Sequence, residues 1–489
     1  MSGGNGWLAS TMPTRTGRPQ SSMAGGWGGV GWSTARFRSL GVAGIIRHVT
    51  ESTPKRLLVL SYEFPPSGGG GVQRIAKFCR DLRHLGWEPH VITAEHVPGR
   101  PEDPSLLADV AGIPVTRLPH RNAVRAVARP IAQVKRVLRT AGPGGTAAGV
   151  GAGGAPSIGT PLSTRIVRWV CVPDEARRWA ASVVRHVRRF GERYDAVLAS
   201  GPPHSTLIAG RRCAETLGVP LIADMRDAWA TNPHFLRPTP LHRALARRAQ
   251  RRVCGSAAVV TAVSPDIARE AERFGASRAV MLPNGYDAAE MPPLTGAPGS
   301  PLALAFMGRF YGLTDPSPLL EAMRTVIAEE GPESIRFDVV GEGSPAVREA
   351  VRAAGLEEVV RFHGYLPHRA ALEVVAGADV GVVVIANVPG SRAVYTGKLF
   401  EYLGMGLPVL LAGPVDGAAA QLVGDASAGR VVSYGDTAAL ASTLREMLVL
   451  KVRGEALATP DGEQVARYER SRLAQTLATL LDEMLGDET

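Results

Sequence analysis

The feature of the sequence that most constrains the fold is a strand, a helix and a second strand that follow one another closely. Residues 56–62 form a mostly apolar run typical of a buried strand, and residues 89–93 form the next one. Between them runs one apolar stripe at helical spacing, made of Val72, Ile75, Cys79, Leu82 and Leu85. Two strands joined by a helix and short loops are expected to be neighbours in a parallel sheet.

The same alternation continues along most of the chain and forms two series. The first series has further predicted strands at 194–200, 219–224, 257–263 and 278–282. A linker rich in Pro and Gly, residues 291–300, precedes the second series. The second series has predicted strands at 302–307, 335–340, 359–362, 380–385, 408–411 and 430–433. We therefore predict an α/β fold of two successive Rossmann-like, doubly wound domains.

Shifts in composition mark the boundaries of these domains. Residues 1–53 are rich in Gly, Ser, Thr and Arg with little periodicity, and we predict that they form a disordered extension. The N-terminal domain is predicted over residues 54–290, with a flexible Gly- and Ala-rich insertion at 141–160. The C-terminal domain is predicted over 301–463, and a helix within 464–489 is expected to pack across the domain junction.

Charge and cysteine content indicate the environment and the partners. The chain has 55 Lys and Arg against 45 Asp and Glu, and this net charge of +10 favours an anionic partner. Nucleic acid is not predicted as that partner, because the sequence has no zinc-finger, RNA-recognition or basic-zipper signature. Four scattered cysteines suit a reducing cytosol. Since no run reaches the ~18 apolar residues of a membrane span, we predict a cytoplasmic protein.

A basic amphipathic segment suggests contact with a membrane surface. Residues 121–139 contain six Lys and Arg and no acid, with apolar residues between them. Such a segment can lie on an anionic bilayer, so we predict peripheral contact with the inner membrane face. Pro130 interrupts the segment, and the alternative is a solvated loop with an ordinary basic face.

A glycine-rich loop stands between the first predicted strand and the helix that follows it. Ligands of doubly wound sheets bind at the carboxyl ends of strands. Backbone N–H groups at Gly70 and Gly71, together with the helix dipole, can bind an anion there. Gln73 stands where a dinucleotide fingerprint requires its last glycine. The alternative is a loop that is merely flexible.

Ionisable residues follow two other predicted strands of the first domain. His204 follows one strand, and Asp224, Arg226 and Asp227 follow the next. Asp227 or His204 could orient an acceptor hydroxyl and take its proton, with Arg226 and Asp224 on the acceptor side. The alternative is that both aspartates cap turns and pair with Arg226.

Candidate donor contacts follow the strands of the second domain. Arg309, after Gly308, could bind a diphosphate bidentately. Glycines also end the next strands, where a flat ring could lie on the backbone. The further candidates for donor binding are Gly341, Glu342, Tyr365 and Thr396.

Lys398 and Glu401 are three residues apart and therefore share a helix face. A cation and a carboxylate at a helix start suit a phosphate and the vicinal diol of a ribose. The alternative is a surface ion pair, worth about 0.2–0.5 kcal/mol.

Seven short motifs follow one another along the chain in the order that is found in GT-B-fold glycosyltransferases of family 4, and this chain resembles that family over roughly residues 56–485. The set comprises a Gly-Gly loop, D-x-R-D-x-W, P-N-G-x-D, G-R, V-G-x-G, F-x-G and K-L-F-E-Y-L-x-x-G-x-P-V. The resemblance implies two domains that face a cleft and a retaining transfer from a nucleotide-sugar donor to a hydroxyl acceptor. It also implies acceptor contacts from the first domain and donor contacts from the second, namely Arg309, Glu342, Lys398 and Glu401.

Two positions depart from the family pattern. Members often carry a Glu eight residues before the one that matches Glu401, where it holds the donor sugar, but this chain has Ala393. Many also carry a Lys about five residues after the Arg of the G-R motif, where this chain has Thr314. Lys398 could supply the missing charge, and the departures leave the donor sugar open.

We expect no catalytic metal and no cofactor, with the nucleotide sugar as co-substrate. The chain has no Asp-x-Asp, and a metal would usually be held by nearby carboxylates. Fixed cations and helix N-termini can stabilise a leaving nucleoside diphosphate instead. The alternatives are a nucleotide-binding oxidoreductase, which lacks its third glycine here, a hydrolase, and a catalytically decayed nucleotide-sugar-binding protein. Ala393 and Thr314 are the best support for decay.

Overall fold

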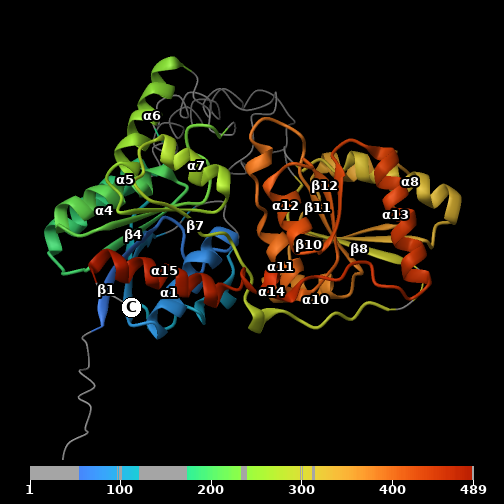
Figure 1. The fold of residues 1–489 in the computed structure, drawn as a ribbon, viewed down its shortest axis with the longest axis horizontal. Helices are drawn as coiled ribbons and strands as arrows, with labels where there is room; N and C mark the ends of the chain where they lie inside the picture. The colour runs from blue at the N-terminus through green and yellow to red at the C-terminus, as the bar shows by residue number, and fades with distance from the viewer. Residues whose placement is uncertain are drawn as a thin grey trace, which may run out of the picture. The chain divides into compact units, whose positions relative to one another are not determined.

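A computed structural model describes residues 54–95, 97, 102–120, 173–232, 239–297, 299, 301–310 and 314–486. It contains two parallel β-sheets, each with helices on both faces (Figure 1). The strand order is β3-β2-β1-β4-β5-β6-β7 in the first sheet and β10-β9-β8-β11-β12-β13 in the second. The predicted fold class is therefore confirmed. The predicted extension 1–53, the insertion 141–160 and the basic segment 121–139 lie outside the described residues.

The first sheet begins in its centre at β1 and winds outward in both directions, which places β1 and β4 side by side. Its strands are β1 Lys55–Ser61, β2 Trp87–Ala94, β3 Val115–Leu118, β4 Ala196–Gly201, β5 Leu221–Met225, β6 Val259–Ala262 and β7 Ala279–Met281. Its helices are α1 Gly70–His84, the short η1 Pro104–Leu107, α4 Arg177–Phe190, α5 His204–Leu217, α6 Pro240–Cys254, α7 Pro265–Arg273 and η2 Ala288–Glu290.

The second sheet repeats this arrangement. Its strands are β8 Leu302–Met307, β9 Ile335–Val340, β10 Val360–Gly364, β11 Val380–Val384, β12 Val409–Gly413 and β13 Gly429–Ser433. Its helices are α8 Ser317–Glu330, α9 Pro345–Ala353, α10 His368–Ala376, η3 Ser391–Ala393, α11 Gly397–Met405, α12 Ala418–Asp425 and α13 Thr437–Val452. Helices α8, α9 and α13 bury one face, and α10, α11 and α12 bury the other.

The central strands are apolar on both sides because helices cover both faces of each sheet. In the first sheet, Leu58 and Leu60 point into a core closed by α4, α5, α6 and α7. Leu57 and Val59 point into the opposite core, which α1 closes. This double burial explains why continuous apolar runs predicted these strands.

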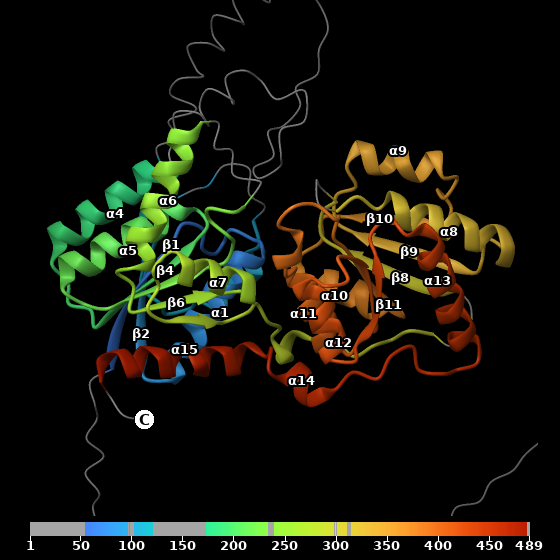
Figure 2. The ribbon, with the colours of Figure 1, turned by 45° about the horizontal axis from the view of Figure 1, so that its top comes forward.

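The C-terminal segment forms two helices, α14 Gly462–Ala466 and α15 Arg470–Leu485, rather than one (Figure 2). Between them, Tyr468 O accepts from Tyr286 N at 3.1 Å, and Arg470 N donates to Tyr286 O at 2.8 Å. These backbone groups bond to Tyr286 instead of continuing a helix. Helix α15 then packs along α1, where Leu477 lies in the same apolar core as Ile75.

Among the described residues, no helix has both the length and the apolar character required to cross a membrane.

Candidate active site

Glycine turns meet at the carboxyl edge of the second sheet. A Cβ on Gly341 would lie 2.0 Å from Gly308 O, and Gly308 N donates to Val340 O at 2.8 Å. Gly341 also forms a β-bridge with Gly364. The turns after β8, β9 and β10 therefore pack against one another closely enough that only glycine fits at Gly341. At these glycines the turns present backbone atoms rather than side chains.

Lys398 lies in the first turn of α11, directly beside these turns. Its Nζ is 3.6 Å from the centroid of the Phe306 ring, and a Cβ on Gly308 would lie 3.4 Å from it. Burial lowers the pKa of Lys398 to about 7, although the charge of Glu401 acts in the opposite direction. Within the described part of the chain, no carboxylate lies within ion-pair distance of Lys398. This amine is thus held by the protein without a counter-ion, next to the N-terminus of a helix.

Thr396 precedes the first residue of α11 and does not cap it with its side chain. Its hydroxyl oxygen is buried and lacks a hydrogen-bond partner among the described residues. The N-terminus of α11 therefore offers N–H groups, a hydroxyl and Lys398 together, which is a favourable combination for an anion.

Glu401 lies one turn further along α11 and is 7% exposed. Its Oε1 is 3.5 Å from His368 Nε2, at the start of α10. Burial raises the pKa of Glu401, while the charges of His368 and Arg470 act in the opposite direction. Glu401 is therefore a buried carboxylate that faces His368, and the alternative of a surface pair with Lys398 does not describe the structure.

Arg309 and Glu342 form an ion pair at the same edge, 3.1 Å from Nη2 to Oε2. Their side chains are 54% and 64% exposed, and exposed pairs of this kind contribute only about 0–1 kcal/mol. Arg309 can therefore exchange Glu342 for a phosphate at little cost. Tyr365 is half exposed, and its hydroxyl lies 3.5 Å from Glu102 O.

Asp224 does not face an acceptor, because the core of the first sheet uses its carboxylate. It is 1% exposed and pairs with Arg74 at 2.8 Å. It also accepts from Ser200 Oγ at 2.6 Å and from Thr261 Oγ1 at 2.9 Å. Burial acts to raise the pKa of Asp224, but Arg74 and the hydrogen bonds lower it overall. The prediction of an acceptor contact at Asp224 is replaced by a structural ion pair, and Arg226 is not its partner.

Arg226 occupies the space that the glycine-rich loop leaves open. A Cβ on Gly71 would lie 1.7 Å from Arg226 Nη1, so Gly71 makes room for this guanidinium. Arg226 also donates to Pro202 O. In this structure the loop at Gly70 and Gly71 therefore lies beside an arginine, and a phosphate at Gly71 would have to share that position with it.

Asp227 is accessible to solvent at the carboxyl edge of the first sheet. The protein packed around it raises the pKa of its carboxyl to about 6, and the charge of Arg226 acts in the opposite direction. His204, by contrast, is 2% exposed and stacks on Trp229, with ring centroids 4.6 Å apart. Of the two candidate bases, Asp227 is the one that an acceptor can reach.

Sequence reasoning missed Glu270, which holds the loop after β5. Its Oε1 accepts from Trp229 N at 3.0 Å, Ala230 N at 2.9 Å and Gln250 Nε2 at 2.9 Å, and its Oε2 accepts from Thr231 Oγ1. The signal was present: Glu270 lies between Ile267 and Ala271 on the apolar face of α7, where a carboxylate requires partners.

We expect Glu270→Ala to destabilise the protein, because the backbone N–H groups of Trp229 and Ala230 lose the carboxylate oxygen that accepts from them. The free energy of unfolding should fall by about 1–3 kcal/mol. Glu272→Ala, on the exposed face of the same helix, is the matched control and should change it by less than about 0.5 kcal/mol. Thermal unfolding of the three proteins checks this, and equal melting temperatures would contradict the role of Glu270.

Comparisons with known proteins agree with the fold. Residues 69–285 match the family model described as "Glycosyl transferase 4-like domain". Residues 301–449 match the model described as "Glycosyl transferases group 1". The two matches follow each other along the chain and together include every strand of both sheets except β1.

The chain belongs to the GT-B glycosyltransferases of the family 4 type.

Individual relatives of this glycosyltransferase are distant. A phosphatidyl-myo-inositol mannosyltransferase of Mycobacterium leprae is 30% identical over 221 residues, which is 43% of this chain but 56% of the relative. Sucrose-phosphate synthase from Thermosynechococcus elongatus has a TM-score of 0.60 at 14% identity, over 89% of this chain and all of that one. Anabaena HepE in complex with UDP and glucose has a TM-score of 0.56 at 16% identity, over 87% and 99%. These two structures show the fold.

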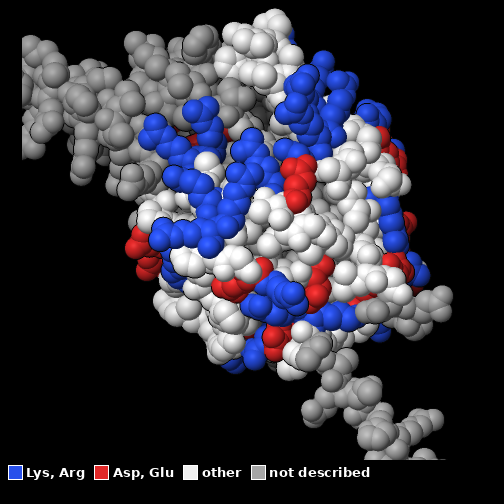
Figure 3. Space-filling model, turned by 90° about the vertical axis from the view of Figure 1, so that its left-hand side faces the viewer, with Lys and Arg blue, Asp and Glu red and all other residues white. Residues whose placement is uncertain are grey.

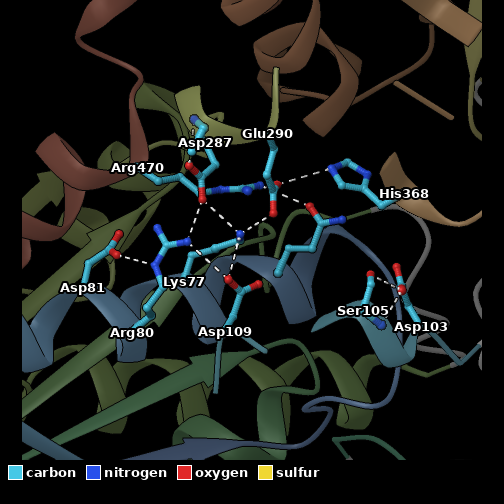
Figure 4. Close-up of polar contacts among 12 residues, drawn as sticks. Lys77, Arg80, Asp81, Asp103, Ser105, Asp109, Asp287, Glu290, His368 and Arg470 are labelled. Carbon is cyan, nitrogen blue, oxygen red and sulfur yellow. Dashed lines mark hydrogen bonds and ion pairs between the residues drawn. The ribbon is translucent and has the colours of Figure 1, made fainter. Parts of the chain in front are cut away.

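The P-N-G-x-D motif of this glycosyltransferase lies where the first sheet passes into the linker. A Cβ on Gly285 would lie 2.1 Å from Tyr468 O, so glycine lets the C-terminal segment approach. Asp287 Oδ2 is 2.9 Å from Lys77 Nζ and 2.7 Å from Arg80 Nη1 (Figure 4). Burial acts to raise the pKa of Asp287, but the bonds to Lys77 and Arg80 lower it to about 2. The motif is thus structural.

Lys77, on α1, forms ion pairs with Asp287 and Glu290, just before the linker (Figure 4). It is 1% exposed and also pairs with Asp109 at 3.0 Å. The nitrogen of His368 that faces Glu401, Nε2, also lies 3.8 Å from Glu290 Oε2. The same ionic cluster therefore reaches from α1 to the buried carboxylate of Glu401.

Over the part of the glycosyltransferase that the structure describes, no group of three His, Cys, Asp or Glu side chains is arranged to hold a metal ion.

Proposed function

We propose that the protein transfers a sugar from a nucleoside-diphosphate sugar to a hydroxyl acceptor, with retention of configuration and without a metal or another cofactor. The observation that carries this proposal is Lys398, a half-buried amine beside the glycine turn at Gly308 that has no carboxylate within ion-pair distance among the described residues. The complex of the structurally similar Anabaena HepE with UDP and glucose supports a nucleotide-sugar donor.

Each donor group would have a partner at the edge of the second sheet. Lys398, the N-terminus of α11 and a re-oriented Arg309 would bind the diphosphate, and Glu401 would accept hydrogen bonds from the ribose diol. The turns at Gly308, Gly341 and Gly364 would receive the base. Because the diphosphate gains charge as the sugar leaves, groups that are already oriented toward it stabilise the transition state more than the ground state.

On the acceptor side, Asp227 would take the proton of the hydroxyl, with Arg226 close to it and His204 beneath the same loop. A base must be deprotonated to act, and the pKa of Asp227 is raised to about 6. Below that pH the carboxyl is increasingly protonated, and above it the base is available.

We therefore expect kcat/KM for the acceptor to fall about tenfold per pH unit below pH 6. In Asp227→Asn this acidic limb should disappear and the residual rate should be flat across it. Asp266→Asn, at an exposed carboxylate on α7, should retain the limb. A wild-type profile without an inflection between pH 5 and 7, measured at saturating donor, would exclude Asp227 as the base.

Retention is tested on the product, and metal independence is tested by chelation. Proton NMR of the new glycosidic bond should give the anomeric configuration of the donor. Activity should be unchanged in excess EDTA, since Lys398 and α11 would carry the role of a metal. An inverted product or loss of activity on chelation, restored by Mg²⁺ or Mn²⁺, would overturn the corresponding part of the proposal.

The proposed acceptor and place of reaction rest on a relative and on the charge of the chain. The mycobacterial relative is a phosphatidyl-myo-inositol mannosyltransferase, and the chain is basic. We propose a lipid-linked acceptor and a cytoplasmic enzyme that works at the inner membrane face. The oxidoreductase alternative has no supporting observation. The decayed-site alternative rests on Ala393 and Thr314, and turnover of any nucleotide sugar would exclude it.

A further inference from the structure

Helices α4 and α6 carry ten arginines and no acidic residue. All ten are exposed, and we call this surface the arginine face: Arg177, Arg178, Arg185, Arg188, Arg189, Arg243, Arg247, Arg248, Arg251 and Arg252. Lys and Arg side chains dominate the upper half of this side of the molecule (Figure 3). These ten positive charges are as many as the net charge of the whole chain, +10.

The arginines of this face are not neutralised by the part of the protein that the structure describes. Among the residues that the structure describes, no carboxylate lies within ion-pair distance of any of them. Ten like charges on two helices repel one another, which disfavours the folded state unless an anionic partner compensates. Guanidinium groups are weakly hydrated and bind phosphate oxygens bidentately, so a surface rich in phosphates is the complementary partner.

Apolar side chains accompany the charges on α6. Ala246, Gln250, Val253 and Cys254 face the core, which leaves Leu241 and Leu245 on the outer side. Leu241 is 65% exposed and Leu245 44%. Leu241, Leu245, Arg248 and Arg252 follow one helical stripe, and a shallow hollow beside it is lined by Ala244, Leu245, Arg248, Arg251 and Arg252. A surface that carries both arginines and exposed leucines fits a phospholipid headgroup region, which offers phosphates and apolar acyl chains, better than it fits a nucleic acid.

The arginine face also borders the acceptor-side edge. Helix α5 packs between α4 and α6, and it begins at His204. Asp227 lies after β5, at the same edge of the sheet where α6 begins. A surface that binds the arginine face therefore lies close to the residues proposed to receive the acceptor.

We propose that the arginine face docks on an anionic phospholipid bilayer, with Leu241 and Leu245 entering the headgroup region and the acceptor-side edge held at the membrane. This inference rests on the proposed function of an enzyme that works at the inner membrane face. It adds the arginine face as the surface that contacts the membrane, and this surface differs from the basic segment 121–139. Duplex DNA and acidic proteins are the competing partners, and the test includes the former.

The test is co-sedimentation of the full chain with vesicles of phosphatidylcholine alone and with one quarter phosphatidylglycerol. Wild type should bind only the anionic vesicles, less tightly at high salt because exposed charges are screened. Arg248→Glu/Arg252→Glu should bind at least about tenfold more weakly, since each cation near the surface adds to the attraction. Leu241→Ser/Leu245→Ser should weaken the binding that persists at high salt.

Arg361→Glu/Arg453→Glu is the matched control, because it makes the same charge change at exposed arginines of the second sheet. It should bind as wild type does. Failure of wild type to bind anionic vesicles, or equal loss in the control, would overturn the proposal. So would tighter binding of 20-base-pair DNA than of vesicles in 0.15 M salt. Nucleoside-diphosphate release without vesicles should be equal in all variants, and its absence in wild type would count against the proposed function rather than the docking.

Discussion

Lys398→Ala is expected to lower kcat/KM for the nucleotide sugar by about a hundredfold to a thousandfold, the usual cost of removing one preorganised group from a developing negative charge. The amine has no carboxylate partner within ion-pair distance among the described residues, so its removal leaves no buried acid unpaired. The fold should therefore tolerate the change. The measurement is initial-rate kinetics at pH 6.5, with the melting temperature measured alongside.

The pH dependence distinguishes an electrostatic role for Lys398 from a structural one. Burial lowers its pKa to about 7, so the charged form is present below that pH and is lost above it. Donor kcat/KM should fall above pH 7 in wild type, and Lys398→Arg should extend the profile to higher pH because arginine keeps its proton. Lys451→Arg, on α13, keeps a positive charge beside Asp379 and is a control that should leave this limb in place. A wild-type profile without the alkaline limb would contradict the assignment.

Glu401→Ala is expected to weaken nucleotide-sugar use by about tenfold to a hundredfold. A carboxylate that accepts two diol hydrogen bonds in a dry site contributes roughly 1.5–3 kcal/mol, and 1.4 kcal/mol corresponds to a factor of ten. Glu401 also faces His368, so part of any loss could come from local rearrangement. Glu401→Gln keeps the volume and one acceptor, and it should lose less activity than the alanine variant.

Binding of the free nucleoside diphosphate, compared with binding of its 2′-deoxy form, tests the contact to the ribose alone. Glu401→Ala should bind the nucleoside diphosphate more weakly but should no longer discriminate it from the 2′-deoxy form, which lacks half of the diol. Glu373→Ala, an exposed glutamate on α10, should retain the discrimination. If Glu401→Ala still prefers the ribonucleotide as strongly as wild type does, Glu401 does not bind the ribose.

Periodicity predicted the architecture well because most strands are buried on both faces. The apolar runs at residues 302–307 and 335–340 have the same bounds as β8 and β9. The missed strand, β3, has four residues at the edge of the first sheet, and none of them is fully buried. Such a strand has little hydrophobic signal, and only its pairing with β2 defines it. The break between α14 and α15 was missed because it depends on Tyr286, far away in the sequence.

The parts of the candidate site that depend on the spacing of nearby residues could be predicted from the sequence. Spacing alone placed Lys398 and Glu401 on one helix, and both lie at the predicted sheet edge. Spacing could not show that Glu401 faces His368, that Asp224 pairs with Arg74, or that Gly71 makes room for Arg226. Each of these contacts joins residues that are distant in sequence, and a buried aspartate cannot be distinguished from a catalytic one by residue type.

The most direct test of the central claim measures the release of nucleoside diphosphate from a panel of nucleotide sugars in excess EDTA. Wild type and Lys398→Ala are compared, with a lipid or polyprenyl-phosphate extract supplied as the acceptor. The account predicts that wild type releases diphosphate from at least one donor, that glycosylated acceptor accumulates in equal amount, and that Lys398→Ala is at least about a hundredfold slower. Release by both proteins at the same rate, or binding of nucleotide sugars without any turnover, would contradict it.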